Sequence, residues 1–250
     1  MRFLEKIFQS ISEQVLPTAC IVCEYHQKAA ICNNCLLSLH EKVLCNYECC
    51  YQCGIALHPS EIANQHCEQC KRYPPYFDAS YCLDRYEGSL QNALHQLKYQ
   101  KRLAYAVGLA KAWNAILAQQ LINANAAYLL PVPLSYKKLA LRGFNQSWEI
   151  ARRIECGAHI QKNPYTLKRH HFSEQQAGNK RTDRNLAIQG MFYLEERHLE
   201  LLQDHSVIIF DDVMTSGATL NEIARVLKDN GVKRVTNWVL LRTSMPSTRN

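Results

Sequence analysis

The sequence predicts an α/β protein in which a parallel sheet with flanking helices follows a small cysteine-rich module. Ten of the twelve cysteines lie within residues 20–70, and an apolar strand near residue 210 leads through a loop and a helix to a second strand. The chain has 250 residues and 47% hydrophobic residues. It can therefore bury a sizeable core in one large or two medium domains, which excludes a disordered protein.

The N-terminal stretch MRFLEKIFQSISEQVLPTAC predicts a short amphipathic helix. Charged residues interrupt any signal-peptide core there, and no run of about 18 apolar residues exists anywhere in the chain. We therefore expect no membrane insertion and a cytoplasmic location, where thiols stay reduced and the cysteines do not form disulfides. The apolar face of this helix contains Phe3, Leu4, Ile7, Phe8, Ile11 and Val15.

The cysteines predict two zinc sites. A tetrahedral zinc takes four thiolates from two C-x-x-C pairs, and the chain has four such pairs, Cys20/Cys23, Cys32/Cys35, Cys50/Cys53 and Cys67/Cys70. The simplest pairing is sequential, but the spacing also allows a cross-braced arrangement, the first pair with the third and the second with the fourth. Gly54 suits the tight turn of a knuckle, whereas Cys45 and Cys49 are left over.

The cysteine module is expected to be structural. Four-cysteine sites are closed to substrates, and metal binding can supply folding free energy that so small a core lacks. The net negative charge of the module argues against a nucleic-acid-binding zinc finger. It favours a role in packing against the rest of the chain or in docking to another protein. Pro74 and Pro75 mark a stiff linker, so we expect domains at 1–75 and 76–250.

The segment after the linker predicts a strand and two helices. Residues 79–86 fit a strand, and a helix opens at Gly88. A longer helix rich in Ala and Leu is predicted over 103–122. The first of these helices places four apolar residues on one face, namely Leu90, Ala93, Leu94 and Leu97.

The C-terminal part contains a βαβ unit. Residues 207–210 form an apolar run typical of a buried parallel strand, with Asp211 and Asp212 at its end. A small, hydroxyl-rich loop leads into a helix that Gly231 ends, and 235–241 form the next strand. Small residues before a helix N-terminus can wrap a phosphate, and two carboxylates can accept hydrogen bonds from vicinal sugar hydroxyls. The loop contains Thr215, Ser216, Gly217, Ala218 and Thr219.

These features together predict a ribose 5-phosphate site. An ATPase would need a G-x-x-x-x-G-K-[ST] loop, and a dinucleotide fold would need G-x-G-x-x-G. Neither motif is present. A phosphorylated receiver domain would not need the hydroxyl-rich loop.

The segment VIIFDDVMTSGAT resembles the phosphoribosyl pyrophosphate (PRPP) motif of type I phosphoribosyltransferases. The R-G-F-N-Q run at 142–146, the zinc knuckles and the stretches at 86–88 and 97–99 resemble the ComF family over nearly the whole chain. The resemblance implies a type I phosphoribosyltransferase-like parallel sheet with an N-terminal zinc-ribbon module. ComF-type proteins are associated with the handling of single-stranded DNA during natural transformation.

The resemblance also implies roles for individual residues. Asp211 and Asp212 would contact ribose hydroxyls directly or through Mg²⁺, and the loop from Thr215 to Thr219 would hold the 5-phosphate. The pyrophosphate would be bound by Lys137, Lys138 and Arg142. The segment QQAGNKRTDRN resembles the catalytic loop of the fold and contains Gln176, Arg181, Arg184 and Asn185.

Two functions remain open from the sequence. Residues 137–184 hold eleven basic and four acidic residues, a net charge of +7, which suggests weak, salt-dependent binding of single-stranded DNA. The first hypothesis is therefore a competence protein that also docks to the competence machinery. The alternative is an active Mg²⁺-dependent phosphoribosyltransferase of unknown acceptor. The aromatic residues interleaved there are Tyr136, Phe144, Trp148, Tyr165 and Phe172, of which Phe144 and Trp148 are better explained as core.

Overall fold

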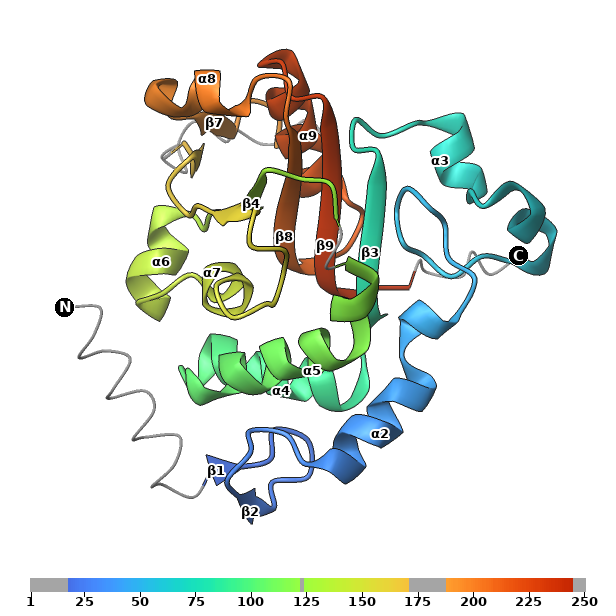
Figure 1. Ribbon diagram of the computed structural model, residues 1–250, viewed down its shortest axis with the longest axis vertical. Helices are drawn as coiled ribbons and strands as arrows, with labels where there is room; N and C mark the ends of the chain where they lie inside the picture. The colour runs from blue at the N-terminus through green and yellow to red at the C-terminus, as the bar shows by residue number, and fades with distance from the viewer. Residues whose placement is uncertain (1–17, 122–123, 171–187, 245–250) are drawn as a thin grey trace, which may run out of the picture.

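The centre of the protein is a five-stranded, fully parallel sheet (Figure 1). The computed structural model describes residues 18–121, 124–170 and 188–244. The strand order is β3-β9-β8-β4-β5, which confirms the predicted α/β class. The strands are β3 (Ala79–Arg85), β4 (Tyr128–Pro131), β5 (Gln161–Lys162), β8 (Ser206–Met214) and β9 (Arg234–Arg242).

Helices cover both faces of this sheet (Figure 1). On one face, α4 (Gly88–Tyr99) and α5 (Ala104–Leu121) pack against the sheet. Trp113 of α5 lies edge-on to Phe210 with ring centroids 5.6 Å apart. On the other face, α9 (Ala218–Asp229) contributes Leu220, Ile223 and Leu227 to a second core. Alternate residues of a strand face opposite ways, so β8 supplies apolar side chains to both cores.

Most predicted elements are confirmed with small shifts of their ends. The helix predicted from Gly88 is α4, and its four predicted apolar residues are all buried. The helix predicted over 103–122 is α5. The β8-α9-β9 unit is present, but β8 continues to Met214. The two aspartates, predicted at the C-terminal end of this strand, lie in its last four residues.

Smaller elements surround the far edge of the sheet. The helices α6 (Tyr136–Arg142) and α7 (Gln146–Ala151) follow β4. An antiparallel pair, β6 (Leu167–Arg169) with β7 (Phe192–Leu194), precedes η3 (Glu196–His198) and α8 (Leu199–Leu202).

The cysteine-rich segment wraps the edge strand β3 (Figure 1). Leu44 N–H donates to Asp84 Oδ1 at 3.1 Å, and the Tyr51 carbonyl accepts from Ser80 N–H at 3.0 Å. Such contacts cover an edge that would otherwise expose unpaired backbone groups. The elements are β1 (Thr18–Ala19), β2 (His26–Gln27), α2 (Asn33–Lys42), η1 (Leu44–Asn46), η2 (Pro59–Asn64) and α3 (Glu68–Arg72).

The segment contributes to both hydrophobic cores. Cys20 and Ile21 belong to the core under α4 and α5, whereas Leu44 and Cys50 belong to the core under α9. Ile21 packs so closely on Gly108 of α5 that a Cβ at Gly108 would lie 2.7 Å from it. Across the described ranges no helix has the length and apolar character needed to cross a membrane. The helix predicted at the N-terminus lies outside the described residues.

Candidate functional site

The loop from Thr215 to Thr219 joins the end of β8 to the first turn of α9. Gly217 has φ +82°, a left-handed conformation that favours glycine. Thr215 and Ser216 are exposed, and Ser216 Oγ accepts from Ala218 N–H at 3.4 Å. The loop encloses a cavity of about 70 Å³ that Asp211 also lines. Hydroxyls and the N-terminal amides of a helix therefore surround a space suited to an anion.

The two aspartates face different surroundings. Asp211 lines the loop cavity, whereas Asp212 forms an ion pair with Lys98 at the end of α4. Asp211 is 9% and Asp212 is 4% exposed. The Asp212 carboxylate is therefore held by the protein itself, and of the two aspartates only Asp211 lines the loop cavity.

The Asp212 carboxylate is the centre of a buried polar network. Besides Lys98, Gln146 Nε2 donates to Asp212 Oδ1 at 3.1 Å, and Ser147 Oγ lies 3.4 Å from both Asp212 Oδ1 and Asp211 Oδ1. The helices α4 and α7 are thereby tied to β8. A buried charge needs such partners, because an uncompensated one is strongly destabilising.

The two carboxyl groups differ in pKa. Burial, reinforced by the neighbouring Asp212 charge, raises the pKa of Asp211 well above its ordinary value of 3.8. Burial alone would also raise the pKa of Asp212, but the Lys98 charge and hydrogen bonds from Lys98 and Gln146 outweigh it and lower that pKa. Burial opposes the charge of Lys98, yet Asp212 raises its pKa overall. Asp211 is therefore the weaker acid of the two and Asp212 the stronger.

The R-G-F-N-Q run forms the corner between α6 and α7. Gly143 ends α6 with φ +85°. Asn145 caps α7 by accepting from Ser147 N–H at 3.0 Å, and its Nδ2 donates to the Val132 carbonyl at 2.9 Å. Arg142 donates to Gln146 Oε1. The corner thus joins the loop after β4 to the aspartates through Gln146.

The predicted pyrophosphate-binding residues lie on α6. Lys137 and Lys138 are exposed, and Arg142 is half-buried with its guanidinium 5.8 Å from the Tyr99 ring centroid. Gln176, Arg181, Arg184 and Asn185 lie outside the described residues, as does Phe172. In the chain these residues lie between β6 and β7, which pair antiparallel.

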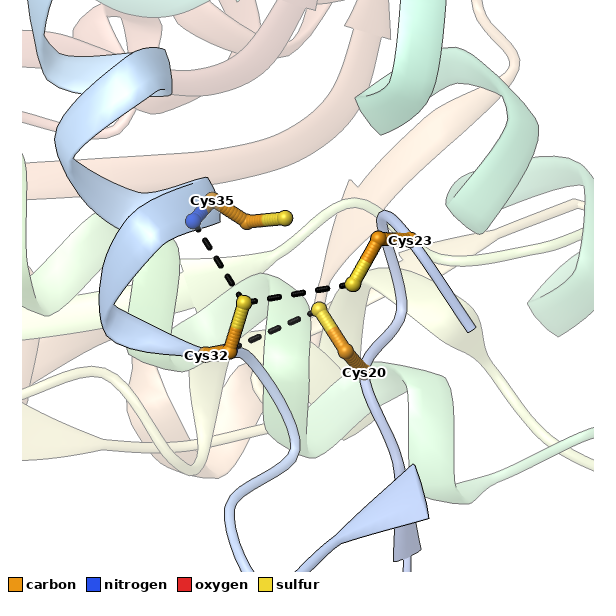
Figure 2. A group of neighbouring side chains, drawn as sticks. All are labelled: Cys20, Cys23, Cys32 and Cys35. Atoms are coloured by element: carbon orange, nitrogen blue, oxygen red, sulfur yellow. Dashed lines mark hydrogen bonds between the residues drawn. The ribbon is translucent and has the colours of Figure 1, made fainter. Parts of the chain in front are cut away.

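The cysteines form two clusters of four, which we call the first cluster (Cys20, Cys23, Cys32, Cys35) and the second cluster (Cys50, Cys53, Cys67, Cys70). Figure 2 shows the first, with its four sulfur atoms facing a common centre. In each cluster the sulfurs lie within 4.8 Å of one another. The sequential pairing is thus the one that the structure forms, and the cross-braced alternative is wrong.

The sulfur geometry fits zinc. The Cys23 and Cys32 sulfurs are 3.9 Å apart, and those of Cys53 and Cys67 are 3.7 Å apart. Zinc–sulfur bonds of about 2.3 Å in a tetrahedron imply sulfur separations of about 3.8 Å. Gly54 has φ +65°, and a Cβ there would lie 2.4 Å from Cys82 Sγ, so glycine is required after the knuckle. Burial raises the pKa of Cys45 and of Cys49 to about 11, and neither joins a cluster.

Sequence reasoning assigned no role to three residues that the structure brings to the aspartates. Lys98 and Gln146 belong to stretches that carry the family resemblance, and Ser147 follows directly. The helical spacing of Leu90, Leu94 and Leu97 could have indicated that Lys98 lies at the buried end of that face. Its ion pair joins positions more than 100 residues apart in the chain, which no local pattern predicts.

Comparison with known proteins agrees with this arrangement. The phosphoribosyl transferase domain matches residues 141–247, the part of the chain that holds α7, the aspartates, the loop and β9. Fold and site together therefore define a protein with a phosphoribosyltransferase-type domain.

The chain belongs to the ComF/YhgH family. It is 32% identical over 228 residues to the DNA utilization protein YhgH of Salmonella typhi, which covers 85% of this chain and 90% of that relative. It is 27% identical over 236 residues to competence protein F of Haemophilus influenzae, covering 89% and 96% of the two chains. A solved hypoxanthine phosphoribosyltransferase of Staphylococcus aureus is 14% identical, with 57% of this chain and 73% of that chain covered and a TM-score of 0.32. The family assignment rests on the similarity to the sequence relatives.

Proposed function

We propose that the loop after β8 binds PRPP together with Mg²⁺. The observation that carries this proposal is the shared cavity of Asp211 and the hydroxyl-rich loop at the N-terminus of α9. The loop amides and hydroxyls would hold the 5-phosphate. Asp211 would accept hydrogen bonds from the ribose hydroxyls, directly or through the metal, while Asp212 keeps α4 and α7 in place. Lys137, Lys138 and Arg142 would attract the pyrophosphate.

The proposed cellular role is the handling of incoming single-stranded DNA in natural transformation. The names of the relatives, which refer to competence and to DNA utilization, support it. The exposed lysines of α6 and the 67% exposed Tyr136 beside them suit a nucleic-acid backbone and its bases.

Three further basic residues in the described part of the segment are less available for DNA. Arg152 and Arg153 pair with Glu149 at 2.8 and 2.7 Å, and Lys162 bonds the carbonyls of Arg152 and Ile154. Phe144 packs against the core under α4 and α5, as the sequence suggested, and Trp148 is half-buried. The proposed DNA path is therefore narrower than the net charge of residues 137–184 implies.

Fluorescence anisotropy with a long labelled oligonucleotide tests the DNA role. We expect weak binding that falls steeply with salt and changes when Mg²⁺ and PRPP are added. Lys137→Gln with Lys138→Gln should weaken binding, and Lys111→Gln on the exposed side of α5 is the matched control. A metal-loaded, folded protein with no binding at low salt would exclude direct DNA handling.

The second candidate function is phosphoribosyl transfer to an unknown acceptor. The chain of contacts from Arg142 through Gln146 to Asp212 favours it, because it links the proposed pyrophosphate side to the sugar side. Cations near a departing pyrophosphate lower the barrier electrostatically. Release of pyrophosphate with one acceptor, absent in Asp211→Asn, would establish this activity.

The two clusters would each hold a structural zinc, and the segment around them would dock to the competence machinery in the cytoplasm. Four cysteines per site leave no open coordination position for a substrate. The boundary between the cysteine segment and the phosphoribosyltransferase-type domain is proposed at residues 75–76, where the two prolines precede β3, and the two parts share both hydrophobic cores.

A further inference from the structure

Arg242, at the end of β9, is a buried guanidinium between the second cluster and the proposed PRPP loop. It is 2% exposed. Its Nε donates to the Cys53 carbonyl at 3.0 Å. Its Nη1 donates to the Met214 carbonyl at 3.2 Å and to the Thr215 carbonyl. One side chain thus touches a predicted metal-binding knuckle and the first residue of the loop.

The charge of Arg242 has no carboxylate partner among the described residues. A buried cation of this kind needs compensation. Four thiolates and one Zn²⁺ carry a net charge of −2, and the guanidinium is anchored on the carbonyl of Cys53, a member of the second cluster. The loaded cluster would therefore supply the negative charge that keeps Arg242 in position.

The position matters because both loop contacts are to backbone carbonyls. Met214 and Thr215 are the residues at which β8 passes into the loop. The Met214 carbonyl also accepts from Thr243 N–H at 3.1 Å. The planar guanidinium bonds both loop carbonyls through Nη1 while its Nε is held by the Cys53 carbonyl, which fixes the direction in which the following loop leaves the strand.

We propose that Arg242 is a positioning residue that couples metal loading of the second cluster to the geometry of the 215–219 loop. This inference rests on the proposed function in one respect, namely that the 215–219 loop binds a phosphate ligand. Coupling of this kind is reciprocal. A ligand held by the loop should therefore slow metal loss from the second cluster and leave the first cluster unaffected.

Hydrogen–deuterium exchange of the full-length, zinc-loaded protein tests the coupling without any ligand. In Arg242→Lys, which keeps the charge but loses the planar guanidinium that joins the Cys53 carbonyl to the loop carbonyls, amides of residues 215–220 should exchange about tenfold faster, the effect of losing one or two hydrogen bonds. Cys67→Ser in the second cluster should have the same effect. Arg234→Lys is the matched control, because Arg234 joins β9 to Tyr51 at the opposite end of the strand.

Cys32→Ser in the first cluster is the control for metal loss as such. Unchanged exchange in Arg242→Lys, or equal loop exchange in the Cys32 and Cys67 variants, would overturn the proposal. If a variant does not fold, metal release from the wild-type protein to a chelator is measured with and without Mg²⁺–PRPP, and alkylation shows which cysteines are freed first. Slower release from the second cluster alone supports the coupling, and equal effects on both clusters overturn it.

The two proposals can fail separately. If the wild type does not bind Mg²⁺–PRPP but loop exchange still follows Arg242 and the second cluster, the ligand assignment is wrong and the coupling stands. If PRPP binds and neither loop exchange nor PRPP affinity changes in Arg242→Lys, the coupling is wrong and the ligand assignment stands.

Discussion

Asp211 and Asp212 are neighbours in the chain but have opposite electrostatic roles. Asp212 is a carboxylate with a buried cation beside it, and Asp211 is a carboxyl whose pKa is raised by burial and by that carboxylate. The sequence could predict that two acids meet a ribose, but not which of them is the weaker acid. That depends on Lys98, which arrives from a distant helix.

The raised pKa of Asp211 predicts that ligand binding releases a proton. Hydrogen bonds from sugar hydroxyls, or a metal ion, favour the ionised carboxyl, so affinity for Mg²⁺–PRPP should rise as pH increases above the ordinary value of 3.8. Calorimetry in buffers of different ionisation enthalpy measures the proton count. The phosphates of the ligand also exchange protons, and binding to the Asp211→Asn variant measures that contribution alone. If affinity depends on pH equally in the wild type and in Asp211→Asn, the prediction is contradicted.

The Lys98–Asp212 pair should be important for stability. Lys98→Met leaves a buried carboxylate unpaired and should reduce the free energy of unfolding by about 3 kcal/mol. Urea denaturation measures this, and Lys111→Met is the surface control. Lys98→Met combined with Asp212→Asn should recover much of the loss, since no charge is then left buried. A single variant as stable as the control would show that the pair contributes little.

The Asp212 pair also has a pH signature. The pKa of Asp212 is lowered in the folded protein. The stabilisation from its ion pair with Lys98 is therefore present above pH 3.8 and disappears as pH falls through the lowered pKa. Loss of stability in acid should therefore be smaller in the Lys98→Met, Asp212→Asn double variant than in the wild type. Equal acid sensitivity of the two proteins would contradict this assignment.

The shape of the loop between β8 and α9 depends on the left-handed backbone conformation of Gly217. The sequence predicted the strand, loop, helix and strand because each has a local signature, including Gly217 and the stop at Gly231. It misplaced the end of β8, because hydrogen bonding to β9 continues beyond the apolar residues. The α6–α7 corner could not be predicted in detail, since Asn145 acts through the distant Val132 carbonyl.

Gly217→Ala should therefore impair both the loop and its ligand. The added Cβ would lie 2.7 Å from the Met214 side chain, and the left-handed backbone adds about 1–2 kcal/mol of strain. Gly88→Ala at the start of α4 is a close match, with φ +66° and no atom within 4 Å of the new Cβ. Both should lower thermal stability, but only Gly217→Ala should weaken PRPP binding. Equal affinities would show that the loop geometry is not needed.

At the scale of the whole molecule, the cysteine segment is part of the domain's core. The first cluster lies with the core under α4 and α5, and the second with the core under α9. Spacing alone predicted two four-cysteine sites, because each pair encodes a knuckle. The spacing of the cysteines could not predict that the segment wraps β3 and places one cluster against each core. That arrangement depends on contacts between distant residues, such as the packing of Ile21 against Gly108.

Metal removal should consequently destabilise the sheet as well as the cysteine segment. We expect two zinc ions per chain by elemental analysis, and a single cooperative unfolding transition that shifts to lower temperature with a strong chelator. Calorimetry with and without chelator measures this. Two separate transitions, with the sheet unaffected by the chelator, would indicate independent modules.

The central claim is that the loop after β8, with Asp211, binds PRPP. Isothermal titration of the zinc-loaded protein with Mg²⁺–PRPP tests it most directly, comparing the wild type with Asp211→Asn. Asparagine matches the protonated form of Asp211 and leaves the Lys98–Asp212 pair in place, so the variant should fold normally. The account predicts saturable 1:1 binding in the wild type and its loss in Asp211→Asn. No binding in the wild type, or undiminished affinity in the variant, would contradict it.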